Sequence, residues 1–221
     1  MNKTLNSSEL YRRRHETEAN LPEHLTLRIH RSLSWLERAE KQTDDDSAFI
    51  FYWLAFNALY ARERIDHIES MESERDILGQ YFEKIALLDE DRTIYDEFWQ
   101  RFSDPVRNLL ANKFVFQPFW NHFNNIPGND DWEERFEKSK IMSLVALKHE
   151  DTEKILKLVF DRLYVLRNQV FHGAATWHSS LNRDQIRDSL RILAFLVPIL
   201  IDLMMKNPQE SWGRPYYLVV K

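Results

Sequence analysis

Residues 153–172 read EKILKLVFDRLYVLRNQVFH, and Gly173 follows them directly. Large apolar residues recur every three or four positions along this stretch, which is the spacing of one face of an α-helix. Glycine is the residue type that most often follows the carboxyl end of a helix. The stretch therefore predicts a long amphipathic helix that ends close to Gly173.

Three other segments have strong helical patterns. Residues 47–61, SAFIFYWLAFNALYA, are apolar almost all round, which is typical of a helix in the middle of a bundle. Residues 24–41 and 183–206 show the helical period, and Pro198 is expected to kink the second of them. The sequence thus predicts an all-α fold, a helical bundle whose four core helices are 24–41, 47–62, 153–172 and 183–206.

The rest of the chain is expected to extend this bundle within one domain, residues 1–221. Residues 1–22 are interpreted as a polar, poorly ordered arm. Residues from about 70 to 147 are expected to form a mostly helical insertion. Within it, residues 112–132 are rich in Phe, Trp, Asn and Pro, which indicates irregular structure with short helical pieces.

Composition limits the classes of function. Hydrophobic residues make up 43% of the 221, ample for a large core. No cysteine is present, which excludes disulfides and thiolate metal sites and makes the cytoplasm the simplest compartment. The net charge of −5 argues against a broad basic groove for duplex nucleic acid but is compatible with a local site for single-stranded RNA.

The sequence gives no indication of a membrane protein. The first twenty residues contain no apolar segment like that of a secretory signal. The longest apolar run, residues 192–205, is shorter than a membrane span and contains both Pro198 and Asp202. We therefore expect no membrane partner.

Arg167 is the residue whose position most suggests a functional role. On a helical wheel it falls within about 40° of the line of Leu156, Phe160, Leu163 and Val170, where an apolar residue is expected. A guanidinium there needs a carboxylate, carbonyl groups, water or a bound phosphate. A structural ion pair with a buried carboxylate is the alternative to a functional role.

His172 supplies the second half of a candidate site, and the pair needs neither metal nor cofactor. An imidazole can take the proton of a ribose 2′-hydroxyl or protonate a leaving oxygen, while a guanidinium stabilises charge on the phosphate. His172 lies about 140° from Arg167 on an unbroken helix. The two converge if the helix unwinds near Gly173 or if two chains pair. A helix-end histidine without function is the alternative.

Residues 167–172, RNQVFH, resemble the R-x4-H signature of HEPN domains, and residues 51–60 are similar to the helix preceding the signature in Apea-like members. The resemblance implies a helical bundle, often a homodimer, and a metal-independent RNase of toxin–antitoxin or phage-defence systems. It implies Arg167 and His172 as catalytic residues, with Asn168 assisting. Some members are instead non-catalytic modules for dimerisation or for binding a nucleotide or a partner, such as an antitoxin or a nucleotidyltransferase, and this is the alternative function.

Candidate RNA-binding residues follow the signature. Arg183, Arg187 and Arg191 lie four residues apart and form a ridge that would guide RNA phosphates. Asp184 and Asp188 precede two of these arginines by three residues, which favours ordinary surface ion pairs. His178, in the loop between the helices, is a third RNA-binding candidate beside Arg183 and Arg187.

Aromatic residues gather in the expected insertion. They have two interpretations, a set of stacking platforms for RNA bases or a small local core. The second is favoured. The residues are Phe114, Phe116, Phe119, Trp120, Phe123 and Trp132.

Overall fold

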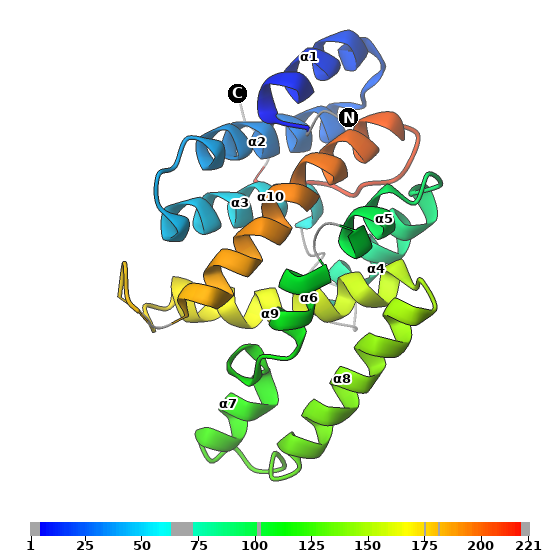
Figure 1. The fold of residues 1–221 in the computed structure, drawn as a ribbon. Helices are drawn as coiled ribbons and strands as arrows, with labels where there is room; N and C mark the ends of the chain where they lie inside the picture. Colours follow the sequence, from blue (N-terminus) through cyan, green and yellow to red (C-terminus); the bar gives the residue numbers. More distant parts are fainter. Residues whose placement is uncertain (1–4, 63–72, 101–102, 175, 181, 218–221) are drawn as a thin grey trace. The chain divides into compact units, whose positions relative to one another are not determined.

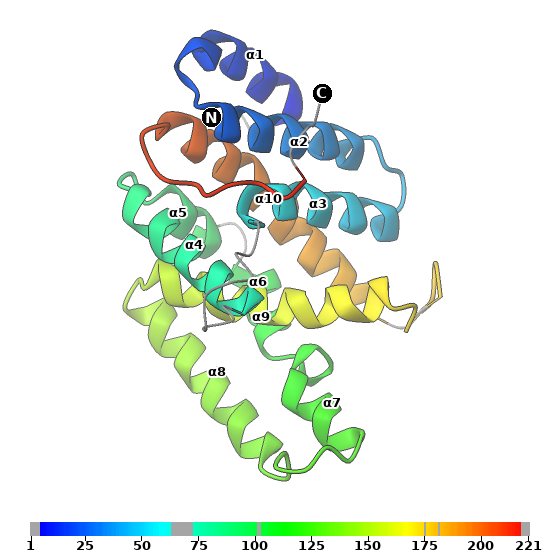
Figure 2. The ribbon, with the colours of Figure 1, turned by 180° about the vertical axis from the view of Figure 1, so that it is seen from behind.

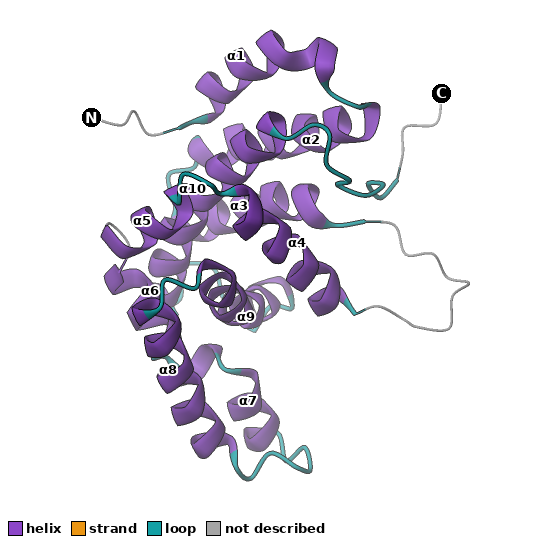
Figure 3. Ribbon diagram, turned by 90° about the vertical axis from the view of Figure 1, so that its right-hand side faces the viewer, coloured by secondary structure: helices purple, strands orange, loops and turns teal. Residues whose placement is uncertain are grey.

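A computed structural model describes residues 5–62, 73–100, 103–174, 176–180 and 182–217 of the chain (Figure 1). Over these residues the secondary structure is helical and no strand is formed, as the colouring of Figure 3 shows. The all-α class predicted from the sequence is confirmed. None of the described helices is both long enough and apolar enough to cross a membrane.

The helices divide between two compact units, Met1–Glu90 with Leu193–Lys221 and Asp91–Ile192. The first unit contains α1 (Ser7–Thr17), the short 3-10 helix η1 (Glu18–Asn20), α2 (Glu23–Glu40), α3 (Asp45–Tyr60) and α4 (Glu74–Leu88). The second contains α5 (Thr93–Gln100), α6 (Ser103–Leu110), η2 (Lys113–Val115), α7 (Gln117–Phe123), α8 (Trp132–Lys148) and α9 (Thr152–Phe171). The last helix, α10 (Arg183–Lys206), belongs to both, because the division falls at residues 192 and 193.

The first unit is built on a hairpin of α2 and α3, which lie side by side in Figure 1. Leu25, Ile29, Leu33 and Leu36 of α2 are buried, as the periodicity predicts. The Asp44 side chain caps α3 by accepting a hydrogen bond from a backbone N–H of its first turn, which satisfies one of the donors that a helix start leaves open. The hairpin thus forms by local patterning and capping.

The prediction of a poorly ordered arm over residues 1–22 is wrong for Ser7–Thr17, which form α1. Leu10 is fully buried, and the backbone N–H of Ser7 donates to a carboxylate oxygen of Glu40 at 2.9 Å. Arg13 forms an ion pair with Asp202 at 2.7 Å. A mostly polar helix is therefore held in place by a single apolar side chain and a few charged contacts.

Arg28 of α2 shows how the first unit satisfies a buried charge without an acid. Its guanidinium is fully buried and donates to the carbonyl oxygens of Ala58, Leu59 and Ala61 at the end of α3, and to that of Gly213. Those carbonyls have no partner within the helix. Burial lowers the pKa of Arg28 to about 10. This arginine closes the end of α3 and fixes the segment after α10.

The second unit is arranged around α9, which packs against α6, α8 and η2. Leu156, Phe160 and Leu163 of α9 are fully buried, as the wheel predicts. Figure 2 shows α7 and α8 of this unit from behind, and these two helices also contact each other. The short helical pieces expected over residues 112–132 are present as η2 and α7. The arrangement of all four core helices in one bundle remains a prediction.

Candidate functional site

The carboxyl end of α9 is capped by backbone hydrogen bonds to its last carbonyl groups. The N–H of Gly173 donates to the carbonyl of Val170 at 3.2 Å, and that of Ala174 donates to the carbonyl of Gln169 at 2.9 Å. Gly173 has a φ of +71°, in the left-handed region that glycine adopts most easily. The predicted ending of the helix is confirmed, and it places His172 at the C-cap position.

Arg167 is half-buried on α9, so the predicted fully inward position is realised only in part. Its Nη1 donates to Oδ1 of Asn168 at 2.8 Å, and its guanidinium carbon lies 5.1 Å from the ring centre of Phe171 and 5.6 Å from that of Tyr164. Its Nε is buried without a hydrogen-bond partner. Within the described part of the chain no carboxylate pairs with Arg167, which is evidence against the structural ion pair considered for it.

His172 and Asn168 lie at the same helix end. Asn168 is half-buried, and its backbone carbonyl accepts from the N–H of His172 at 3.0 Å. The His172 side chain is exposed. Over the described residues, the imidazole makes no hydrogen bond to Arg167, so a single chain brings the predicted pair to one end of α9 without joining them.

The other RNA-binding candidates lie in the following loop and in the first turns of α10. His178 is exposed, has a φ of +55° and lies with its ring 4.1 Å from that of Trp177. Arg183 is the half-buried first residue of α10. Arg187 pairs with Asp184 at 2.5 Å, which confirms that expected ion pair. RNA binding by these residues remains a prediction.

Sequence reasoning missed Arg162, the most deeply buried arginine of α9. Only 4% of Arg162 is exposed, its guanidinium carbon lies 4.4 Å from the ring centre of Phe116, and its Nη2 donates to Oγ of Ser139 at 2.8 Å. Burial lowers the pKa of Arg162 to about 10, while the charge of Asp161 opposes this shift. Arg162 is the structural arginine of this helix.

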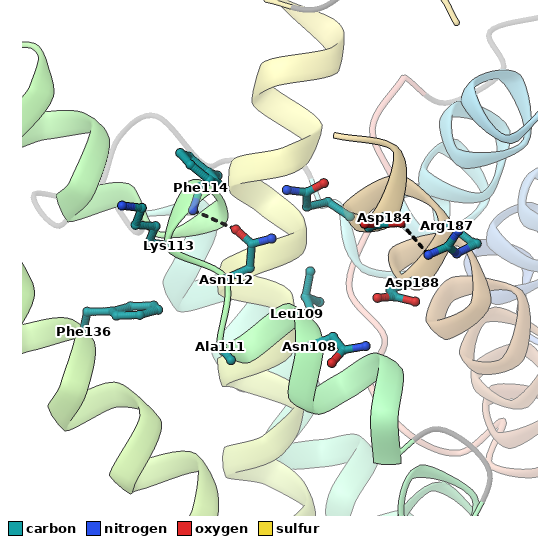
Figure 4. Close-up of a pocket in the computed structure, with 11 residues that line it drawn as sticks. Asn108, Leu109, Ala111, Asn112, Lys113, Phe114, Phe136, Asp184, Arg187 and Asp188 are labelled. Atoms are coloured by element: carbon teal, nitrogen blue, oxygen red, sulfur yellow. Dashed lines mark hydrogen bonds and ion pairs between the residues drawn. The ribbon is translucent and has the colours of Figure 1, made fainter. Parts of the chain in front are cut away.

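A pocket of about 680 Å³ lies in the same unit (Figure 4). It is formed by the end of α6, by η2, by the first turns of α10 and by one ring of α8. Its lining residues are Asn108, Leu109, Ala111, Asn112, Lys113, Phe114, Phe136, Asp184, Gln185, Arg187 and Asp188. Of these residues, sequence analysis had singled out Phe114, Asp184, Arg187 and Asp188. The others carry no pattern in the sequence, because the pocket brings together segments that lie far apart in the chain.

The aromatic side chains near this pocket contact one another, as the small-core interpretation predicts. Phe119 lies at the centre, with its ring 5.1 Å from both Trp120 and Trp132 and 5.5 Å from Phe114. Phe114 is nevertheless 43% exposed, and it is one of the residues that line the pocket. Of the six aromatic residues, Phe116 is buried whereas Phe114 and Phe123 are exposed, so only part of this cluster forms a core.

One side chain of the signature reaches the pocket wall. The Nε2 of Gln169 donates to the carbonyl oxygen of Phe114 at 2.7 Å. The Oε1 of the same side chain accepts from Nδ2 of Asn182, just before α10, at 3.2 Å. The end of α9 that holds Arg167 and His172 is thus linked directly to two of the segments around the pocket.

Comparisons with models of protein families, with curated proteins and with solved structures give no match for this chain. The resemblance to HEPN domains therefore rests on residues 51–60 and 167–172. Residues 51–60 lie within α3, and residues 167–171 form the last part of α9, with His172 at its C-cap.

Proposed function

We propose that this chain is a metal-independent endoribonuclease of HEPN type that cleaves single-stranded or looped RNA at the end of α9. The observation that supports this most is the state of Arg167, a half-buried guanidinium without a carboxylate partner in the described part of the chain. A cation in that state is suited to an anion supplied from outside, and the phosphate of RNA is such an anion.

The neighbours of Arg167 orient it for this role. Asn168 accepts a hydrogen bond from one N–H group of Arg167, and the rings of Tyr164 and Phe171 lie near its guanidinium. A planar guanidinium presents five N–H donors in a fixed fork that matches phosphate oxygens. Because only one donor is used by Asn168, others remain to stabilise charge on the phosphate in the transition state.

His172 would perform the proton transfers. As a neutral imidazole it takes the proton of the ribose 2′-hydroxyl, and the 2′-oxygen then attacks phosphorus while the bond to the 5′-oxygen breaks. An imidazolium donates a proton to that leaving oxygen. The products are a 2′,3′-cyclic phosphate and a 5′-hydroxyl. In a homodimer the two copies of His172 would supply the base and the acid of one reaction.

A toxin or phage-defence role, with an antitoxin or a nucleotidyltransferase as partner, fits this activity and belongs to the same proposal. The alternative, a non-catalytic module for dimerisation or partner binding, uses the same helix end without chemistry. The two differ in a single property, whether RNA is cut.

The test is incubation of the purified chain with single-stranded RNA in EDTA, comparing wild type with Arg167→Ala and His172→Ala. We expect cleavage by wild type and its loss in both variants. His149 provides a matched control, because it is an exposed C-cap histidine at the end of α8, so His149→Ala should cleave normally. Absence of cleavage by wild type, or cleavage that persists unchanged in both site variants, would reject the proposal in favour of the non-catalytic module.

A further inference from the structure

Helix α8 carries a patch of apolar side chains on its surface. Ile141, Met142, Leu144 and Val145 are each between 44% and 60% exposed. Exposed apolar residues are usually scattered singly over a protein, whereas these four fall within five consecutive positions of one helix. Exposed apolar residues that lie together in this way are typical of an interaction surface.

The patch lies on the outer side of α8. The other side of the helix is covered, because Phe136, Ser143, Ala146 and Leu147 are buried. Within the second unit α8 packs against α6, α7 and α9 (Figure 2). The helix is therefore amphipathic toward its own unit and carries a second, uncovered apolar side.

Charged residues of opposite sign lie at the two ends of the patch. On a helical wheel Glu137, Ile141 and Lys148 fall within about 40° of one another. Glu137 and Lys148 are both exposed, one before the patch and the other after it. Glu137 forms an ion pair with Lys140 at 2.8 Å, whereas Lys148 has no ion-pair partner in the described part of the chain. The outer side of α8 thus reads acid, apolar, base.

We infer that α8 pairs through this patch with α8 of a second copy of the chain, in antiparallel orientation. Glu137 and Lys148 each lie about 8 Å along the helix from a point between residues 142 and 143. A two-fold axis through that point brings Glu137 level with the partner's Lys148, and the same contact occurs a second time by symmetry. It also brings Ile141 level with the partner's Leu144. A parallel pair would place like charges together.

The apolar side chains supply most of the free energy of this association, because they lose their contact with water. The exposed ion pairs contribute little but favour the antiparallel orientation. Because α8 has only 17 residues, the interface is smaller than the standard of about 800 Å² per partner, and we expect a Kd of about 1–100 µM. A second copy is the occupant that supplies both complementary charges at the required spacing.

This inference does not rest on the proposed function. Ser139 of α8 accepts a hydrogen bond from Arg162, in the middle of α9, and the chain continues from the patch toward the beginning of α9. Arg167 and His172 lie toward the other end of α9. Pairing through α8 and pairing through the two copies of His172 are therefore different contacts, and a chain that makes both forms an assembly of more than two copies.

Disulfide cross-linking tests the geometry, since the chain contains no cysteine of its own. A mixture of Glu137→Cys and Lys148→Cys chains should form linked dimers under mild oxidation. Each variant alone should form at least about fivefold fewer, because its two cysteines would be about 16 Å apart along the helices and a disulfide spans about 7 Å between Cα atoms. Leu87→Cys, at an exposed position of α4, is the control and should link with neither. Linking of like positions, or none in the mixture, would overturn the inference.

Sedimentation equilibrium of the full chain from about 1 to 300 µM tests the strength of the contact. Wild type should self-associate, and Leu144→Glu, at an exposed position that tolerates a charge in the folded monomer, should weaken this at least about tenfold. Leu87→Glu and His172→Ala are controls that should retain association through α8. A monomeric wild type, or unchanged association of Leu144→Glu, would overturn the inference whatever the RNA assay shows. Cross-linking through α8 without RNA cleavage would reject the nuclease alone.

Discussion

The side-chain amide of Gln169 donates to the backbone carbonyl of Phe114 at 2.7 Å, and this contact joins the end of α9 to the wall of the pocket. Gln169 is the third residue of the RNQVFH signature, whereas Phe114 belongs to η2. A residue that the sequence marks only as a spacer between Arg167 and His172 therefore has a defined structural partner.

Gln169→Ala should loosen η2 without unfolding the protein. A single hydrogen bond of this kind contributes about 1 kcal/mol, so amide exchange at residues 113–116 should rise about two- to tenfold. Hydrogen exchange followed by mass spectrometry measures this. Gln42→Ala is the control, because Gln42 also donates to a backbone carbonyl, that of Arg38 at 2.7 Å, but in the first unit. Unchanged exchange at residues 113–116 would show that the contact does not hold η2.

Substitutions of the two arginines of α9 should affect stability and activity differently. Arg162→Ala removes a buried side chain packed on Phe116 and should lower the free energy of unfolding by about 2–4 kcal/mol. Arg167→Met should change it by less than about 1 kcal/mol yet reduce cleavage by about 100-fold or more. Urea unfolding and single-turnover cleavage of RNA measure the two effects. Equal destabilisation by both variants, with cleavage falling only as the protein unfolds, would contradict this division.

Gly173 should be replaceable by asparagine at lower cost than by alanine. A Cβ added there meets nothing within 4 Å, so the cost comes from its φ of +71° and not from a clash. Alanine should destabilise the protein by about 1 kcal/mol, and asparagine, which tolerates this conformation better, by less. Thermal unfolding of the three proteins gives the comparison. An alanine variant as stable as wild type would mean that the helix end does not require this backbone conformation.

Asp188 should make stability depend on pH. Because its pKa in the folded protein is raised above the ordinary value of 3.8, the folded state binds this proton more tightly than the unfolded state. Its contribution to stability is full below pH 3.8 and is lost as the pH rises through the folded pKa. Asp188→Asn should therefore be more stable than wild type at pH 7, with an advantage that shrinks toward pH 4. A difference in Tm that stays constant over this range would contradict the shift.

The main helices were predictable because their pattern is local. The bounds of α2, α3, α9 and α10 lie within two residues of the predicted ranges, since the apolar period and the glycine after α9 mark them. In α1 the period is weak, because Leu10 is its one buried apolar residue, and the helix is held by Glu40 and Asp202 from distant segments. Helix α6 was not among the helices predicted one by one. Its Pro105 lies in the first turn, where proline is tolerated.

The candidate site was predictable only in part. The wheel identified Arg167 as an arginine among apolar residues, but burial of α9 extends over a wider arc because α6, α8 and η2 all pack on it. That wider arc includes Arg162, whose partners Phe116 and Ser139 lie far away in sequence. The pocket could not be predicted for the same reason. Asn112 and Asp188 line the same pocket only through the packing of the second unit.

The most direct test of the central proposal is the mass of the RNA products formed in EDTA by wild type, Arg167→Ala and His172→Ala. Attack by the ribose 2′-hydroxyl predicts fragments with a 2′,3′-cyclic phosphate and a 5′-hydroxyl from wild type, and uncut RNA from both variants. Products with a 5′-phosphate, or the same products in the same yield from all three proteins, would contradict it.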